Sequence, residues 1–325
     1  MGPAMQIIKM SLAVVALATP IGTAAAQDWP TRPLTMVAPF AAGGSTDAIA
    51  RIMAQRMGTA LGQAVIVENQ GGAGGSIGAR RVANARPDGY TFVLGQWDNF
   101  VANGAVYKLD YDIQADFAPI GLLSINPQVI LARNGLADDL KGLVAYMKAN
   151  PGKVTFTNQQ ASAQLVAVML QKMTGTEVLL VPYKGGGPAM TDMIAGHIDL
   201  LMVQAAIALP QVRAKKVRAF AVLQPERSPV VEGVPSVDEA GVPGLHLPGW
   251  FAFFAPKGTP PEAIAKLNAA MMEALADPAI RARFSDLGLD IVSRERQTPE
   301  ALGAFQKAEI EKWSPQIKAA GIRVE

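Results

Sequence analysis

Short apolar segments with strand character alternate with helical segments along most of the chain, and this alternation restricts the fold more than any other feature. Residues 33–39 predict a strand and residues 48–61 a helix, with a glycine-rich turn between them. Strands at 64–68 and 90–94 follow, on either side of a helix at 76–85. Because each crossover between parallel strands uses a helix, the alternation predicts an α/β fold with parallel sheets covered on both faces.

A second series of such units lies between residues 154 and 203. Strands are predicted at 154–157, 177–182 and 199–203, with helices between them that end at Thr174 and Ala195. The turn sequence Pro39-Phe40-x-x-Gly43-Gly44-Ser45-Thr46-Asp47 has a short counterpart in Pro182-Tyr183-x-Gly185-Gly186-Gly187, with Thr191-Asp192 in the helix behind it. This weak internal similarity suggests two related halves, although glycine-rich turns recur at many strand-to-helix corners.

The C-terminal third carries more helices than its own strands can use. Residues 250–255 predict one buried strand, and the three helices predicted at 260–276, 279–287 and 298–319 need a sheet that is already built. We therefore expect the chain to return to its first domain. The expected division is 27–127 with 249–325 as domain 1 and 128–248 as domain 2, two doubly wound α/β domains joined by a hinge around a cleft.

The N-terminal residues predict an export signal. Lys9 precedes an apolar stretch over residues 10–21, and Ala24-Ala25-Ala26 has the small-x-small pattern of a cleavage site. A membrane anchor is the alternative, but the stretch is shorter than the ~20 residues needed to span a bilayer and contains Pro20. The prediction is a signal peptide over residues 1–26, cleaved after Ala26, and a soluble protein in the periplasm.

Composition removes several classes of function. The 325 residues carry 29 Lys plus Arg against 27 Asp plus Glu, a formal net charge of +2, so no basic field for nucleic acid is expected. There is no cysteine, which excludes disulfides, thiol nucleophiles and zinc-cysteine sites. With only His197 and His246, a histidine metal site or a Ser-His triad is hard to assemble. We expect no metal and no cofactor.

The turn before the first long helix is a candidate anion site. Gly44, Ser45 and Thr46 place backbone N–H groups at a helix N-terminus, where they lack intrahelical partners and where the helix dipole favours negative charge. The alternative is an ordinary tight turn with Ser45 as the N-cap and Asp47 as a helix-start residue. No P-loop or complete G-x-G-x-x-G motif is present, so nucleotide binding lacks a sequence basis, and Ser45 has no histidine nearby in sequence to support hydrolysis.

Several motifs in order along the mature chain resemble one known family. They include Pro39-Phe40-x-x-Gly43-Gly44-Ser45-Thr46-Asp47, Val67-Glu68-Asn69, Gly72-Ala73-Gly74-Gly75-x-x-Gly78, Pro87-Asp88-Gly89-Tyr90-Thr91, Asp116-Phe117, Val181-Pro182-Tyr183-Lys184-Gly185 and Trp313. Together they resemble the periplasmic substrate-binding proteins of tripartite tricarboxylate transporters, the Bug family. The resemblance implies a type II periplasmic binding protein, or Venus flytrap, that is a monomer and delivers a small organic carboxylate to membrane permease subunits.

The same resemblance implies a set of ligand-binding residues, with no catalytic residue and no metal ligand among them. The predicted set is Phe40, Ala41, Gly43, Gly44, Ser45, Thr46, Asp47, Gln96, Trp97, Asn158, Gln160, Ser162, Gln164, Gln204 and Ala205. Residues 158–164 depart from the family's Gly/Ser-rich turn and its histidine, and residues 96–100 replace small polar residues, so the ligand's identity is left open between dicarboxylates and aromatic acids.

Trp97 and Phe100 are the residues on which binding of an aromatic acid would depend. If they face the cleft, they can stack on an aromatic acid; the alternative is that both pack beneath the loop. Closure of the two domains is expected to bring the Ser45 and Ser162 loops onto one ligand. Two other functions stay open at this stage, an extracytoplasmic sensor that signals to a membrane partner and, less favoured, an exported hydrolase.

Overall fold

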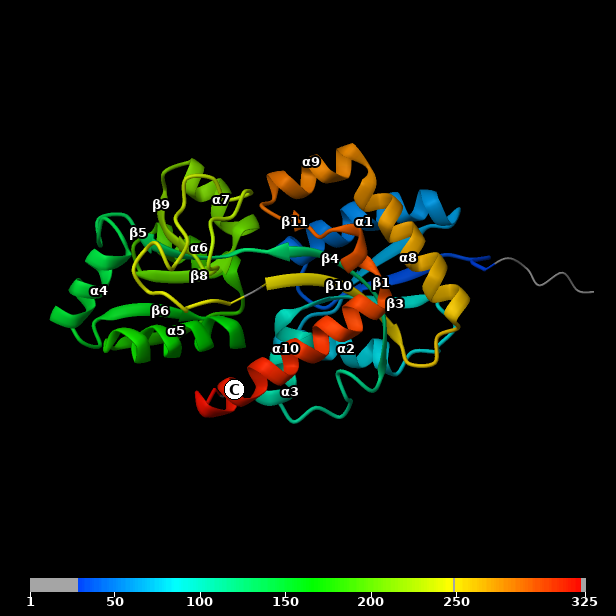
Figure 1. Cartoon of the computed structure of the whole chain (residues 1–325), viewed down its shortest axis with the longest axis horizontal. Coiled ribbons are helices and arrows are strands. Elements are labelled where there is room, and N and C mark those ends of the chain that lie inside the picture. Colours follow the sequence, from blue (N-terminus) through cyan, green and yellow to red (C-terminus); the bar gives the residue numbers. More distant parts are fainter. Residues whose placement is uncertain (1–28, 248, 323–325) are drawn as a thin grey trace, which may run out of the picture.

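The computed structural model describes residues 29–247 and 249–322, which form two α/β lobes lying side by side (Figure 1). The first lobe contains a six-stranded sheet in the order β11-β4-β10-β3-β1-β2. Its strands are β1 (Leu34–Ala38), β2 (Val65–Asn69), β3 (Thr91–Gln96), β4 (Phe117–Asn126), β10 (Gly249–Pro256) and β11 (Asp290–Ile291). Its helices and helical turns are α1 (Ser45–Leu61), η1 (Ala73–Gly75), α2 (Ser76–Ala83), η2 (Asp98–Ala102), α3 (Asn103–Val106), α8 (Pro261–Ala276), α9 (Pro278–Asp286), η3 (Arg294–Gln297) and α10 (Pro299–Ala319).

The second lobe contains a five-stranded sheet in the order β7-β6-β8-β5-β9. Its strands are β5 (Gln128–Arg133), β6 (Val154–Asn158), β7 (Val178–Pro182), β8 (Leu200–Gln204) and β9 (Val217–Val222). Its helices are α4 (Leu140–Ala149), α5 (Ala161–Thr174), α6 (Gly186–Ile194) and α7 (Ala205–Arg213). The predicted α/β class is therefore confirmed.

The prediction that the sheets are wholly parallel is wrong. In the first lobe β1 runs parallel to β2 and β3, but β10 is antiparallel to β3 and β4; in the second lobe β5 is antiparallel to β8 and β9. Strands β3, β4 and β8 end beside the other lobe, whereas β5 and β10 begin there. A strand that enters a lobe from its neighbour must run opposite to the strands that end at the junction.

The chain passes between the lobes after β4 and again before β10. Strand β4 of the first sheet ends at Asn126 and strand β5 of the second begins at Gln128, and Gly249 begins β10, the strand that returns to the first sheet. We propose domain limits of 27–127 with 249–325 and 128–248. The predicted signal peptide and its cleavage site after Ala26 lie outside the described residues.

Both faces of each sheet are covered by helices, and one apolar cluster continues from lobe to lobe. Helices α1, α8 and α9 cover one face of the first sheet, and α2, α3 and α10 cover the other (Figure 1). The cluster shared by the two lobes includes Trp97 and Trp250 of the first lobe together with Ala163 of α5 and Phe156 of β6. The lobes therefore meet through packed side chains on the side of α5 and α10.

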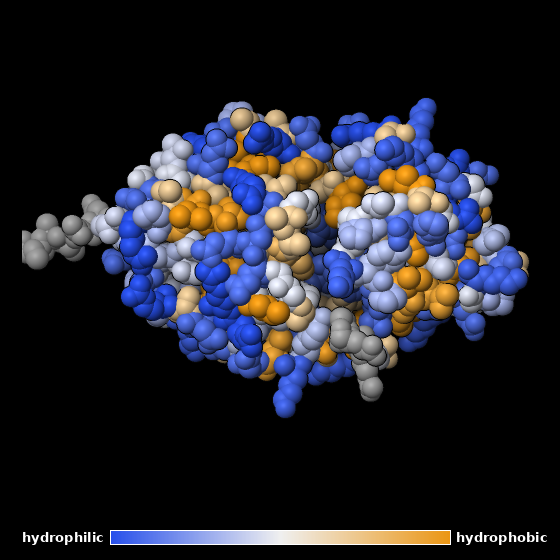
Figure 2. Space-filling view, turned by 180° about the vertical axis from the view of Figure 1, so that it is seen from behind, coloured by the Kyte–Doolittle hydropathy of each residue, from blue (hydrophilic) through white to orange (hydrophobic). Residues whose placement is uncertain are grey.

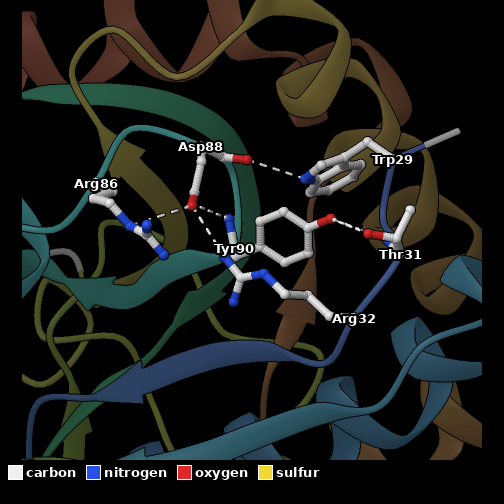
Figure 3. Close-up of polar contacts among 6 residues, drawn as sticks. All are labelled: Trp29, Thr31, Arg32, Arg86, Asp88 and Tyr90. Atoms are coloured by element: carbon white, nitrogen blue, oxygen red, sulfur yellow. Dashed lines mark hydrogen bonds and ion pairs between the residues drawn. The ribbon is translucent and has the colours of Figure 1, made fainter. Parts of the chain in front are cut away.

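The beginning of the described chain is held by the turn before β3 (Figure 3). The Trp29 indole donates to the Asp88 carbonyl at 3.0 Å, and the Tyr90 hydroxyl accepts from the Thr31 backbone N–H at 2.9 Å. The Arg32 guanidinium lies 3.7 Å above the Tyr90 ring and forms an ion pair with Asp88. The Pro87-Asp88-Gly89-Tyr90 motif therefore serves the fold rather than the cleft.

Candidate functional site

A cavity of about 290 Å³ lies between the lobes, where the space-filling surface is hollowed (Figure 2). Both lobes contribute backbone and side chains from the ends of strands and the beginnings of helices. The lining residues are Phe40, Ala41, Ala42, Gly43, Gly44, Ser45, Thr46, Gln96, Gln159, Gln160, Lys184, Gly185, Gly186, Gly187, Pro188, Val203, Gln204 and Ile207.

The first wall is the corner between β1 and α1, which we call the first glycine corner (residues 40–46). Gly43 has φ of 84°, and Gly44 is the N-cap of α1 without a side-chain cap. The N–H groups of Gly44, Ser45 and Thr46 lie at the helix N-terminus, where no intrahelical acceptor exists for them. They are donors suited to a carboxylate.

Asp47 lies behind this corner and holds its shape instead of lining the cavity. Its carboxylate accepts from the Gly43 backbone N–H at 3.0 Å and forms an ion pair with Arg51 at 3.0 Å. Burial raises the pKa of Asp47, but the hydrogen bonds from Arg51 and Gly43 outweigh that effect and lower it below its ordinary value. The predicted ligand role of Asp47 is therefore corrected to a supporting one, because its oxygens are already occupied.

The opposite wall is a second glycine corner (residues 184–188), between β7 and α6. Gly185 has φ of 133° and precedes an α6 N-terminus that also lacks a side-chain cap. The Tyr183 hydroxyl donates to Asp192 inside α6 at 2.6 Å, and this hydrogen bond raises the pKa of Tyr183 to about 12. Asp192 thus supports its corner from within the following helix, as Asp47 does in the first lobe.

The predicted site set omitted this second corner. The signal that finds it was present in the sequence, since Pro182-Tyr183-x-Gly185-Gly186-Gly187 repeats the pattern of the first corner. The set also omitted Ala42, Gln159, Val203 and Ile207, which line the cavity. Nothing in their residue types distinguishes these four from their neighbours.

Two glutamine side chains join the lobes at the cavity. Gln204, at the end of β8, accepts a hydrogen bond from the Ser45 hydroxyl and donates through Nε2 to Oε1 of Gln96 at 3.1 Å. The backbone N–H of Gln96, at the end of β3, donates to the Asn99 side chain at 2.9 Å. The amide of Gln204 therefore fixes the orientation of the Ser45 hydroxyl, which belongs to the other lobe.

The electrostatics of the cavity favour an anion. Within the part of the chain that the structure describes, Lys184 is the one charged side chain that lines it. Helices α1, α5, α6 and α7 all begin beside the cavity, and each helix N-terminus carries a partial positive charge. No group of three His, Cys, Asp or Glu side chains within the described ranges could hold a metal ion.

Five further residues of the predicted set do not line the cavity. They are Trp97, Asn158, Ser162, Gln164 and Ala205. Asn158 is the last residue of β6, Ala205 is buried as the first residue of α7, and Gln164 lies in the first turn of α5. The helical turn after Gln160 carries the side chains that follow it away from the cavity, so Gln160 is at the site and Gln164 is not.

Trp97 and Phe100 are enclosed in the core of the first lobe, so they offer no face for an aromatic ligand. Trp97 is 2% exposed and packs edge-on against Trp313, with ring centroids 5.7 Å apart. Phe100 is fully buried and stacks on Phe254 at 4.0 Å. These contacts correspond to the alternative in which both rings pack beneath the loop.

Ser162 is occupied by the other lobe. Its backbone N–H and its hydroxyl both donate to the Asp98 carboxylate, at 3.0 Å and 3.1 Å. Both residues are buried. The predicted role of Ser162 as a ligand donor is therefore corrected: its donors serve a contact between η2 and α5.

The arrangement around Ser45 is unlike that of a hydrolase. The partner of the Ser45 hydroxyl is the Gln204 amide, which cannot accept a proton as a general base does. His246 pairs with Asp238 at 2.8 Å within the second lobe.

Among the described residues, no helix combines the length and apolar character required to cross a bilayer.

Comparison with known proteins supports the same kind of molecule. Residues 49–322 match the family described as "Tripartite tricarboxylate transporter family receptor". The chain is 43% identical over 304 residues to the "UPF0065 protein in the TAR-I ttuE-ttuC' intergenic region" of Agrobacterium vitis, which covers 92% of this chain and 87% of that protein.

Two solved structures share the fold closely. The periplasmic binding protein BugD superposes with a TM-score of 0.84 at 38% identity, covering 91% of this chain and all of that one. MatC from Rhodopseudomonas palustris with bound malate superposes with a TM-score of 0.82 at 36% identity, covering 89% of this chain and all of that one.

Proposed function

This chain belongs to the tripartite tricarboxylate transporter receptor family, also called the Bug family, and from that premise we propose how it captures its solute. It is a two-lobed α/β solute-binding protein for small organic carboxylates. The proposed ligand is a dicarboxylate held between the lobes, with one carboxylate at each glycine corner. The protein is proposed to act as a monomer in the periplasm and to present the loaded, closed form to the membrane subunits of its transporter.

The observation that carries this proposal is the pair of glycine corners on opposite walls of one cavity. The first offers the N–H groups of residues 44–46, and the second offers the N-terminus of α6 with the ammonium group of Lys184 beside it. No aspartate or glutamate among the described residues lines the cavity. A ligand with two negative ends matches both walls, and the related MatC structure holds malate.

The energetics require both lobes. Micromolar affinity corresponds to about −8 kcal/mol, whereas one exposed helix N-terminus contributes only ~0.3 to 1 kcal/mol. Several charge-assisted hydrogen bonds, at ~1.5 to 3 kcal/mol each, must converge on the ligand. Closure supplies them, because the N–H groups of residues 44–46 and the donors of Lys184 and Gln204 reach the cavity from different lobes.

The test is titration calorimetry of the purified protein against malate, succinate, adipate, citrate, benzoate and terephthalate. We expect binding of at least one dicarboxylate, weaker binding of monocarboxylates, and no binding of the uncharged diamide of the same chain length. Absence of binding to every acid in the panel would contradict the proposal. Preference for benzoate would contradict the two-ended arrangement while leaving carboxylate capture in place.

A further inference from the structure

Asp98 and Ser162 form a contact between the lobes that the ligand site does not use. Asp98 is the first residue of η2 in the first lobe, and Ser162 is the second residue of α5 in the second lobe. The Asp98 carboxylate accepts from the Ser162 backbone N–H at 3.0 Å and from its hydroxyl at 3.1 Å. Neither residue lines the cavity, so this pair has a role other than ligand contact.

The contact completes a helix terminus. The N-cap residue of α5 is Gln160, and its side chain makes no capping hydrogen bond. Asp98 supplies the missing acceptor from the other lobe, at the helix end where a negative charge is favoured. Gln159 and Gln160 precede α5 and line the cavity, so the position of this helix start determines where their side chains lie.

We propose that Asp98 is a positioning residue that caps α5 only when the lobes are closed, and that closure on the ligand takes up a proton at Asp98. The ligand part of this inference rests on the proposed function. The partners lie in different lobes, so separation of the lobes at the two connecting segments breaks both hydrogen bonds. The open form then leaves α5 uncapped and Asp98 accessible to water.

Burial of the Asp98 carboxyl in the closed form explains the proton uptake. In the closed form Asp98 is 6% exposed and has no cationic partner among the described residues. Burial penalises its ionised form more than the two Ser162 donors favour it, and raises the pKa of Asp98 from 3.8 to about 6. Once the Asp98 carboxyl is exposed to water in the open form, its pKa returns toward the ordinary value. A group whose pKa is higher in the closed form binds protons on closing, so acid favours closure.

The other titratable groups around η2 do not account for such an effect. Tyr107, after α3, interacts with the Asp98 charge, but burial raises its pKa from 10 and it stays neutral. Glu309 of α10 is buried beside indoles that all belong to the first lobe, and burial raises its pKa, so its contribution is separated from that of Asp98 by the Glu309→Gln variant below. Lys307, Glu311 and Lys312 of α10 are exposed, and the first turn of α5, strand β3 and η1 carry no charged residue.

The experiment is calorimetry with malate, succinate or adipate, whichever binds, in buffers of different ionisation enthalpy. We expect uptake of about half a proton per ligand bound at pH 6, and an affinity about tenfold higher at pH 5 than at pH 7.5 after subtraction of the ligand's own titration. The Asp98→Asn variant is the reference that measures the ligand's own titration. Its side chain keeps both contacts, because Oδ1 accepts from the Ser162 N–H and Nδ2 donates to the Ser162 hydroxyl. This variant should bind at pH 7.5 without the proton uptake.

Glu309→Gln is the matched control, since it removes a buried carboxyl that lies within one lobe. It should keep the proton uptake of the wild type. Equal proton uptake in the wild type and Asp98→Asn, or none in the wild type at pH 6, would overturn the inference. The wild-type measurement decides the matter even if a variant fails to fold.

A ligand-free measurement separates this inference from the proposed function. Small-angle X-ray scattering should show a smaller radius of gyration for the wild type at pH 5 than at pH 7.5, and no such difference for Asp98→Asn. A wild-type radius of gyration that does not change with pH would contradict the proposal that protonation of Asp98 favours closure. Failure of every carboxylate to bind would count against the proposed function instead.

Discussion

The side-chain amide of Gln204 donates to Oε1 of Gln96 across the two lobes at 3.1 Å, while its own oxygen accepts from the Ser45 hydroxyl. Gln204 is 9% exposed and Gln96 is 3% exposed. One amide therefore links the ends of β8 and β3 to the start of α1, at the point where the ligand is proposed to lie.

Replacing Gln204 tests this link. Gln204→Ala leaves the buried Gln96 oxygen without its donor, and we expect binding of the dicarboxylate to weaken by ~1 to 3 kcal/mol. Gln204→Glu adds a negative charge beside the ligand and should weaken binding further. Calorimetry of both variants measures the effect. Equal affinity of Gln204→Glu and the wild type would place the ligand away from this residue.

The Ser45 hydroxyl is expected to hold the Gln204 amide in place beside the ligand, because its proton is donated to the Gln204 oxygen. Loss of one neutral hydrogen bond corresponds to ~0.5 to 1.5 kcal/mol, so Ser45→Ala should raise Kd by up to about tenfold. Ser285→Ala, on the exposed face of α9, is the control and should bind as the wild type does. If both variants bind alike, the Ser45 hydroxyl does not position Gln204 for the ligand.

Lys184 should distinguish ligands with two charges from those with one. Its side chain is exposed at the second corner, so its electrostatic contribution is small, ~0.2 to 1 kcal/mol. We expect Lys184→Gln to weaken a dicarboxylate by up to about fivefold, with the effect reduced at high salt, and to leave a monocarboxylate unchanged. An equal loss for both ligands would show that Lys184 acts on the corner rather than on the second carboxylate.

Gly185 tests whether the shape of the second corner matters for binding. Its φ of 133° disfavours any residue with a Cβ, and no heavy atom lies within 4 Å of the position a Cβ would take. Gly185→Ala should therefore destabilise the protein by ~1 to 3 kcal/mol through backbone strain alone. Gly233→Ala is a matched control, because Gly233 also has a positive φ of 77° and open space.

Thermal unfolding should show a loss of stability for both glycine variants, and the larger loss for Gly185→Ala, because its φ of 133° with ψ of 169° lies in a region essentially restricted to glycine. Only Gly185→Ala should also weaken the dicarboxylate, since Gly233 does not line the cavity. A Gly185→Ala variant with unaltered affinity would mean that the second corner does not contact the ligand.

Much of the fold was predictable because its signals are local. The helix predicted at 48–61 forms as the greater part of α1, and those at 260–276 and 279–287 correspond to α8 and α9. The strands of 117–133 were not predicted, although they connect the lobes. Their direction depends on where the chain enters each sheet, and residue periodicity does not contain that information.

The candidate site also has one part that could be predicted from the sequence and one part that could not. The corner at 43–46 was predictable because a turn with positive φ before a helix demands glycine, and a helix N-terminus always presents free N–H groups. Ser162 and Trp97 were predicted at the site, yet one donates to Asp98, 64 residues away in sequence, and the other packs on Trp313. Contacts at such separations leave no local pattern.

The sequence by itself determined the α/β class, the order of most elements and the position of the first glycine corner, since periodicity and backbone demands act over a few residues. Only the tertiary structure decided which polar side chains face the cavity and which are consumed by the opposite lobe. The reason is that a hydrogen-bond donor's availability depends on what packs against it, and here that neighbour comes from a distant part of the chain.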